Sequence, residues 1–252
     1  MLVLAPSSAR GWFGGRALAA GPVARVTPRL TAREAGDALE RTFSGAGPAL
    51  AAALITYECE ATVLEYDALG APSVPNASPV TPDAPLVLDP RMAEADAYRS
   101  GVDAVRERIG AGDVYVLNLT HAVTGRAALP PRDTFAALLA RAGSDMSAYL
   151  ELPGLALASV SPERFLRVRA EADGRVVEVC PIKGTRPRGE TPEADAALAA
   201  DLLADPKERA EHVMVVDLER NDLGRVCEPG SVAVDPLYEV VPTPYCHQLV
   251  ST

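Results

Sequence analysis

The chain has 252 residues, of which 48% are hydrophobic and 23% are charged, and its formal net charge at neutral pH is -10. These fractions are typical of a soluble globular protein that is long enough for one large domain or two small ones. The excess of negative charge argues against nucleic acid and against an anionic membrane surface as binding partners.

The four cysteines are widely spaced and form no C-x-x-C pair. This spacing argues against a zinc site or a redox motif, and it favours buried thiols in a reducing compartment. The first residues lack the basic stretch of a signal peptide, and no run approaches the roughly 18 apolar residues of a membrane span. We therefore expect a cytoplasmic protein.

The first part of the chain carries few local signals. Thr31 and Glu34 have the spacing of a capping box, which predicts a helix from there through Phe43. Residues 51–58 are mostly apolar and fit either a buried strand or a short helix, because periodicity does not separate the two in so short a run.

A proline-rich stretch from Gly70 to Pro90 alternates with small and polar residues, which is typical of a linker or surface loop. We place the boundary between two regions there. A small N-terminal region with its linker would occupy residues 1–88, and a larger domain would begin at residue 89 and run to residue 252.

Regular elements follow along the second region, where apolar residues at helical spacing predict helices and alternating ones predict strands. A turn at 172–174 predicts a hairpin. Asp205 and Pro206, followed by Glu208, predict a capping box at the start of a helix. The expected helices span 93–109, 133–141 and 205–223, and the expected strands span 114–121, 148–152, 155–160, 231–234 and 237–241.

The stretch Pro181-Ile-Lys-Gly-Thr-Arg-Pro-Arg-Gly189 concentrates basic residues, prolines and glycines in nine positions. Its prolines and glycines exclude a helix and a regular central strand, and they favour a fixed loop that lets the backbone approach a ligand. By itself such a stretch also fits a solvated basic turn, so the neighbouring motifs decide how it is interpreted.

Two further motifs flank it, Ser161-Pro-Glu-Arg-Phe165 upstream and the segment from Glu211 to Ser231 downstream, which reads EHVMVVDLERNDLGRVCEPGS. In this order the three motifs resemble the chorismate-utilising enzymes, which include anthranilate synthase component I, aminodeoxychorismate synthase component I, and isochorismate and salicylate synthases. The resemblance covers about Tyr98 to Thr252.

Lys183 and Glu163 are the catalytic candidates. A lysine amine is a nucleophile only when deprotonated, and desolvation or neighbouring cations such as Arg186 and Arg188 favour that form. In aminodeoxychorismate synthases, which share P-I-K-G-T, the resemblance implies that this lysine attacks C2 of chorismate and that ammonia then enters at C4. It implies that Glu163 is the general acid that protonates the departing hydroxyl, a step that needs a positioned carboxylic acid.

Glu208 and Glu211 lie three residues apart on the predicted helix, so their side chains share one face. Paired carboxylates suit Mg²⁺, which binds a few carboxylates together with substrate oxygens and water. By resemblance, Glu211 is the direct ligand and Glu208 an outer partner. Without the motifs, the same pair reads as a solvated helix face.

Gly184 and Thr185 would offer a backbone N–H group and a hydroxyl to a substrate carboxylate, and His247 matches a histidine that the family places near the reacting hydroxyl. Val116 departs from the family, which uses lysine there to activate water and usually glutamine in its aminating members. Valine cannot activate water, which counts against isochorismate or salicylate synthesis.

The sequence therefore predicts an α+β fold of antiparallel sheets with flanking helices, the first half of a chorismate-binding domain like that of anthranilate synthase component I. The predicted function is aminodeoxychorismate synthase component I, which aminates chorismate for 4-aminobenzoate and folate with Mg²⁺ and with ammonia from a glutamine amidotransferase partner. The alternatives are anthranilate synthase component I and an inactive fragment.

The last residues, from His247 to Thr252, stand in the middle of a strand pattern. In the family this sequence leads into a second half of the catalytic domain, with a further metal-binding glutamate and a substrate-gripping arginine. We therefore expect the chain alone to turn over chorismate poorly or not at all.

Overall fold

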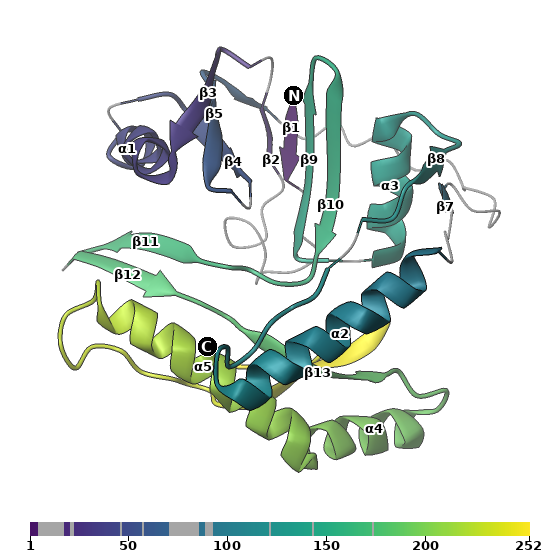
Figure 1. Cartoon of the computed structure of the whole chain (residues 1–252). Helices are drawn as coiled ribbons and strands as arrows, with labels where there is room; N and C mark the ends of the chain where they lie inside the picture. Colours follow the sequence, from purple (N-terminus) through teal and green to yellow (C-terminus); the bar gives the residue numbers. More distant parts are fainter. Residues whose placement is uncertain are drawn as a thin grey trace.

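The computed structural model describes residues 1–4, 18–20, 23–45, 47–56, 58–70, 86–88, 93–120, 122–142, 144–172 and 174–252. Helices and antiparallel sheets make up this part of the chain, as predicted (Figure 1). Most of the proline-rich linker, at 71–85 and 89–90, lies outside the described residues. No helix in the described ranges combines the length and apolar character that a membrane span requires.

A five-stranded antiparallel sheet joins the two predicted regions. Its order is β10-β9-β1-β2-β6, so that the N-terminal strand β1 pairs with β9 from the second region. The domain boundary near residue 88 stays a prediction, but strand pairing crosses it. The strands expected at 148–152 and 155–160 are confirmed as β9 and β10. The bounds are β1 Leu2–Leu4, β2 Leu18–Ala20, β6 Leu69–Gly70, β9 Met146–Leu152 and β10 Leu155–Ser161.

Helix α3 (Pro131–Ala142) packs against β9 and β10, and it confirms the helix expected at 133–141. The contact is apolar: Phe135 and Tyr149 are buried, with their ring centroids 5.5 Å apart. Tilted aromatic pairs at this distance add to the stabilisation that burial provides.

A second sheet, ordered β3-β5-β4, carries helix α1 (Ala32–Phe43) on one face. The predicted capping box is present, because Thr31 Oγ1 accepts from the Glu34 N–H at 3.3 Å and Glu34 Oε2 accepts from the Thr31 N–H at 2.8 Å. The ambiguous run at 51–58 is largely a strand. The bounds are β3 Arg25–Thr31, β4 Leu50–Ile55 and β5 Glu60–Tyr66.

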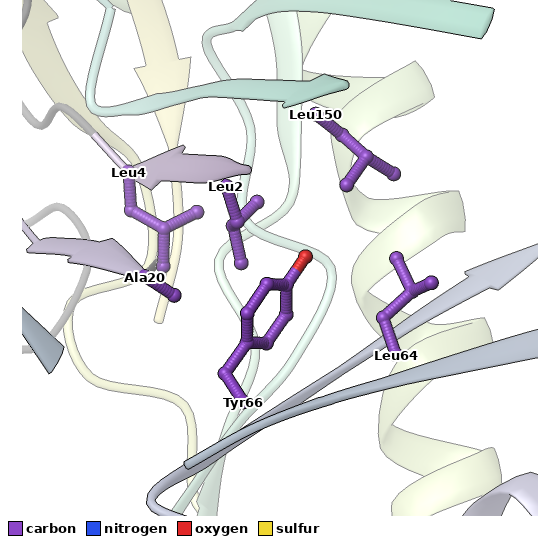
Figure 2. Close-up of a cluster of buried hydrophobic side chains, with 6 residues drawn as sticks. All are labelled: Leu2, Leu4, Ala20, Leu64, Tyr66 and Leu150. Carbon is purple, nitrogen blue, oxygen red and sulfur yellow. The ribbon is translucent and has the colours of Figure 1, made fainter. Parts of the chain in front are cut away.

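The main hydrophobic core lies between these two sheets (Figure 2). Tyr66 and Leu64 of β5 are fully buried and pack with side chains of β1, β2 and β9. Burial of this apolar surface stabilises the fold by about 25 cal/mol per Å² removed from water. The cluster comprises Leu2, Leu4, Ala20, Leu64, Tyr66 and Leu150.

Helix α2 (Ala93–Ala111) is confirmed, and a short pair of strands, β7 (Leu86–Leu88) and β8 (Gly125–Ala127), flanks it in the sequence. The strand expected at 114–121 is wrong: residues 114–120 form no ladder with any described strand, and residue 121 lies outside the described ranges. The alternating apolar and polar residues predicted a half-buried strand, but the apolar ones also face solvent, with Tyr115 70% and Val116 58% exposed.

The third sheet, ordered β13-β15-β14, has helices α4 and α5 on one face (Figure 1). The loop expected at 181–189 is instead a strand over much of its length, at the sheet edge and with an irregular register, so that its prolines and glycines are tolerated. The bounds are β13 Ile182–Pro187, β14 Glu239–Pro242, β15 Cys246–Val250, α4 Pro192–Ala204 and α5 Pro206–Gly224.

The predictions around this sheet have mixed outcomes. The hairpin is confirmed as β11 (Arg167–Glu171) and β12 (Gly174–Glu178), and the strand at 237–241 is confirmed in part as β14. The strand at 231–234 is wrong, because Ser231 closes a turn through N–H and Oγ bonds to the Glu228 carbonyl. Helix α4 was not predicted, although Thr191 caps it in front of a proline.

The helix expected at 205–223 is confirmed as α5, and Asp205 is its N-cap. The predicted capping box with Glu208 is wrong. The Asp205 N–H already donates to the Asp201 carbonyl at the end of α4, and Glu208 turns to Arg186 instead.

Gly189 tests how closely β13 and α4 must approach. A Cβ there would lie 2.2 Å from the backbone nitrogen of Asp195, so Gly189→Ala must push backbone apart. We expect a loss of roughly 3 kcal/mol in the free energy of unfolding, or no folding at all. Gly110→Ala in α2 is the control, since its Cβ meets nothing within 4 Å; it should stabilise the fold by about 0.5–1 kcal/mol. Urea unfolding followed by circular dichroism measures both, and equal midpoints would contradict the packing described.

Candidate active site

The bulge in β13 centres on Gly184. The ladder to β15 pairs Ile182 with Val250 and then Thr185 with Gln248, so that one extra residue is accommodated on β13. Gly184 has φ +90°, and a Cβ there would lie 3.1 Å from both Glu208 Oε2 and Leu202 Cδ1. Only glycine both adopts this backbone conformation readily and lets the two helices approach the strand so closely.

Arg186 fastens the strand to the junction of the two helices. It donates to Asp201 at 2.7 Å, to Asp205 at 2.6 Å and to Glu208 at 3.4 Å. The hydrogen bond to Asp201 is the largest of the effects that raise the pKa of Arg186. The pKa of Asp205 is lowered, first by the Glu208 N–H that its side chain caps. Sequence reasoning did not identify these contacts of Arg186. The two aspartates stand in an Asp-x-x-x-Asp-Pro pattern that begins 15 residues after the arginine.

A second cluster holds the end of β13 to the first turn of α4. Asp195 accepts from Arg188 at 2.7 and 2.6 Å, from the Gly189 N–H at 2.8 Å, and lies 2.9 Å from His247 Nε2. Arg186 and Arg188 are therefore both paired with carboxylates, and neither is the free cation that the sequence suggested beside Lys183.

The strand register separates the predicted substrate-binding residues. Directly opposed residues of an antiparallel pair share a face of the sheet. His247 opposes Arg186 and lies buried against α4, whereas Thr185 opposes Gln248 on the other face. Sequence reasoning missed Gln248, which strand alternation from His247 would have indicated.

Lys183 is half-buried on the bulge and lies near the fully buried His212 of α5. Burial is the main cause that lowers the pKa of His212, and it is opposed by an interaction with the Lys183 backbone. His212 Nε2 lies 2.7 Å from Ser251 Oγ, which also accepts from the Tyr238 N–H at 3.1 Å. This contact links α5 to the end of β15.

Glu163 reaches the same strand from the segment after β10. Its N–H donates to Ser161 Oγ at 3.3 Å, which closes a small turn through Pro162. Its Oε1 accepts from the Ile182 N–H at 3.2 Å. The structure therefore brings Glu163 next to the residue that precedes Lys183.

Glu208 and Glu211 lie in the first turns of α5, as predicted. Glu208 is engaged by Arg186, and the half-exposed Glu211 pairs with Lys207 at 2.9 Å. No group of three or more potential ligands gathers anywhere in the described ranges. Two carboxylates one turn apart nevertheless fit Mg²⁺, which takes one or two protein carboxylates and fills its remaining positions with water and substrate oxygens.

Comparison with known proteins identifies the family of the chain. The family model described as chorismate binding enzyme matches residues 34–252. The chain belongs to the chorismate-binding enzyme family. A solved structure described as a 2,3-dihydroxybenzoate-specific isochorismate synthase, DhbC from Bacillus anthracis, superposes with a TM-score of 0.67 over 99% of this chain and 67% of its own, at 18% identity. The fold class predicted from the sequence is therefore confirmed.

Curated relatives of this chorismate-binding protein carry two names. The aminodeoxychorismate synthase of Streptomyces griseus is 42% identical over 69% of the chain. An anthranilate synthase component 1 of Haloarcula marismortui is 46% identical over 62% of the chain. The chain spans 23% of the first relative's length and 32% of the second's.

The Asp195 cluster predicts a pH-dependent stability. Arg188 first, and then the Gly189 N–H, hold the pKa of Asp195 well below its ordinary 3.8. Such a carboxylate stabilises the fold above that value, and the contribution is lost as pH falls towards the lower folded pKa. Asp195→Asn should therefore lower the thermal midpoint at pH 7 and make its decline below about pH 4 shallower.

Thermal unfolding followed by circular dichroism between pH 7 and pH 2 measures this effect. Asp217→Asn is the matched control, because its exposed carboxylate pairs with Arg220 at 3.0 Å on the same helix. If both variants have the wild-type midpoint and pH slope, the cluster does not hold β13 to α4.

Proposed function

We propose that this protein is an aminodeoxychorismate synthase component I, which replaces the 4-hydroxyl of chorismate with an amino group. The observation that carries the proposal is the position of Lys183, half-buried on the bulged strand and next to the residue whose N–H binds Glu163. Under this proposal, the candidate nucleophile and the candidate acid belong to separate parts of the sequence and share one strand. Relatives named aminodeoxychorismate synthase support the choice, at 42% and 45% identity.

The proposed reaction has two displacements. The unprotonated amine of Lys183 bonds to C2 of chorismate, both conjugated ring double bonds shift by one position, and the C4–O bond breaks. Glu163 gives its proton to the departing oxygen, which leaves as water. Ammonia then bonds to C4, both double bonds shift back, and the C2–N bond to Lys183 breaks, which restores the free amine.

Mg²⁺ is the proposed cofactor, with Glu211 as ligand and Glu208 behind it. When bound, the ion neutralises a substrate carboxylate and fixes its position. Glu208 is itself held by Arg186, so it is anchored to the strand that carries Lys183. The ion would also supply the positive charge that an acidic protein needs in order to accept a dianion, because both arginines of the motif are already paired with the protein's own carboxylates.

Anthranilate synthase component I is the second candidate, because relatives with that name are 46% and 48% identical. Lys183 favours amination at C4, since the family's anthranilate synthases usually have alanine there. Water addition is disfavoured, because Val116 cannot deprotonate water. In either case we propose that the chain acts in the cytoplasm and that a glutamine amidotransferase subunit or domain supplies the ammonia.

Replacement of Lys183 distinguishes the two reactions. With chorismate, Mg²⁺ and ammonium, we expect aminodeoxychorismate as the product identified by mass spectrometry. Lys183→Ala should reduce its formation by at least roughly 100-fold, since covalent catalysis is lost, and should yield anthranilate. The assay is run in parallel on the 252-residue chain and on the longest product of its reading frame, because the chain spans 23% of the length of its Streptomyces griseus relative. Unaltered product formation by the variant would show that Lys183 is not the nucleophile.

Replacement of Glu211 tests the metal site. Glu211→Gln removes one charge without changing the size of the side chain, so the Mg²⁺ concentration needed for half-maximal activity should rise about tenfold or more. Glu193→Gln in the first turn of α4 is the control. Isothermal titration with Mg²⁺ and a chorismate analogue gives a second readout, and equal affinity in both variants would argue against Glu211 as ligand.

A further inference from the structure

One peptide group lies between the two catalytic candidates, the group that joins Pro181 to Ile182. Its N–H donates to Glu163 Oε1 at 3.2 Å, and Lys183 is the next residue along the strand. Its carbonyl accepts from the Ser251 N–H at 3.3 Å. The C=O and N–H groups of a trans peptide point in opposite directions. The bond to Ser251 on one side therefore sets the direction in which the N–H meets Glu163 on the other.

Strand pairing alone gives this peptide group little support. The ladder between β13 and β15 ends with Ile182 opposite Val250, and the irregular register between Ile182 and Thr185 separates this pair from the regular pairs that follow. A bulge disrupts the ladder locally, so the segment before it is held less firmly by its neighbour strand. Ser251 lies just beyond the end of β15, and contacts outside the ladder must keep its N–H in place.

The hydroxyl of Ser251 supplies two such contacts. Its Oγ accepts from the Tyr238 N–H at 3.1 Å and lies 2.7 Å from Nε2 of His212 in α5. Because the oxygen already accepts from a backbone N–H, its own hydrogen is available for donation to Nε2. Ser251 is 1% exposed and His212 is fully buried. Loss of the hydroxyl would therefore leave a buried ring nitrogen and a backbone N–H without this partner.

Tyr238 adopts a backbone conformation that needs external support. Its φ is +65°, in the left-handed region that is rare for a bulky side chain. Its N–H is bound by Ser251, its ring centroid lies 5.7 Å from that of His212, and the Arg209 guanidinium lies 4.5 Å from the same ring. Such conformations persist only where several contacts hold them, and they are frequent near functional sites. His212, Tyr238 and Ser251 thus form one fixed support at the end of β15.

We propose that Ser251 is a positioning residue: its hydroxyl fastens the Pro181–Ile182 peptide to α5, and this peptide orients the carboxyl group of Glu163. With Oε1 accepting the Ile182 N–H, the hydrogen of the protonated carboxyl is on Oε2, because a carbonyl oxygen is the better acceptor. The catalytic part rests on the proposed function. There, Oε2 gives its hydrogen to the departing oxygen, the C4–O bond breaks, and Glu163 is left as a carboxylate that still accepts from Ile182.

Hydrogen exchange of the Ile182 amide, followed by NMR, tests the positioning without substrate. In Ser251→Ala this amide should exchange about tenfold faster or more, since its peptide is no longer held. If that variant does not fold, Ser251→Cys takes its place, because it keeps the volume and weakens both contacts. Ser147→Ala is the matched control: Ser147 of β9 is as fully buried, and its hydroxyl donates to the Ser144 carbonyl at 3.0 Å. An Ile182 rate that rises no more than in this control would overturn the proposal.

Steady-state kinetics test the catalytic part. Ser251→Ala should lower kcat for chorismate about tenfold and leave KM within about twofold, because the acid is misdirected while the substrate contacts remain. Ser251→Thr keeps the hydroxyl and should recover most of kcat, and Ser147→Ala should change neither constant. Unaltered kcat in Ser251→Ala, or an equal loss in Ser251→Thr, would exclude a role for the hydroxyl in catalysis. If wild-type protein converts no chorismate, the proposed function fails together with the catalytic part, while the exchange of Ile182 still decides whether Ser251 holds the peptide.

Discussion

The rest of the site depends on the hydrogen bonds that Arg186 makes to three carboxylates. One guanidinium joins a residue near the end of α4, the N-cap of α5 and a residue in the first turn of α5 to the edge strand β13. An edge strand with a bulge and an internal glycine has weak intrinsic order, and it needs such an external constraint to hold one conformation. The positions of Lys183, Gly184 and Ile182, and through Ile182 that of Glu163, follow from this attachment.

The two faces of the small sheet carry different polar side chains. The face towards α4 and α5 carries the polar contacts of Asp195 with His247 and of His212 with Ser251. The other face carries Thr185 and Gln248 as an opposed pair. In the proposed enzyme, a metal ion held by α5 would balance the substrate's negative charge, because both arginines of the motif are already paired with the protein's own carboxylates.

Most of the elements that the sequence predicted correctly have a local signal at their ends, although the same kind of signal at Thr191 was missed. The capping box at Thr31 and the Asp205-Pro206 start each determine a helix terminus, and both were found. The alternation at 114–120 failed because a strand also needs a partner, and pairing is not encoded locally. For the same reason the sequence did not indicate that β1 pairs with β9, across nearly 150 residues.

The motifs identified Lys183, Glu163 and the two glutamates of α5, but not their surroundings. The pairing of β13 with β15 places His247 and Thr185 on opposite faces of the sheet, and this pairing depends on tertiary structure. Peptide mapping by mass spectrometry after exposure to chorismate tests the central claim most directly. The account predicts a chorismate-derived adduct, less one water, on Lys183 that ammonium removes. Turnover without an adduct on Lys183, or with one on another residue, would contradict it.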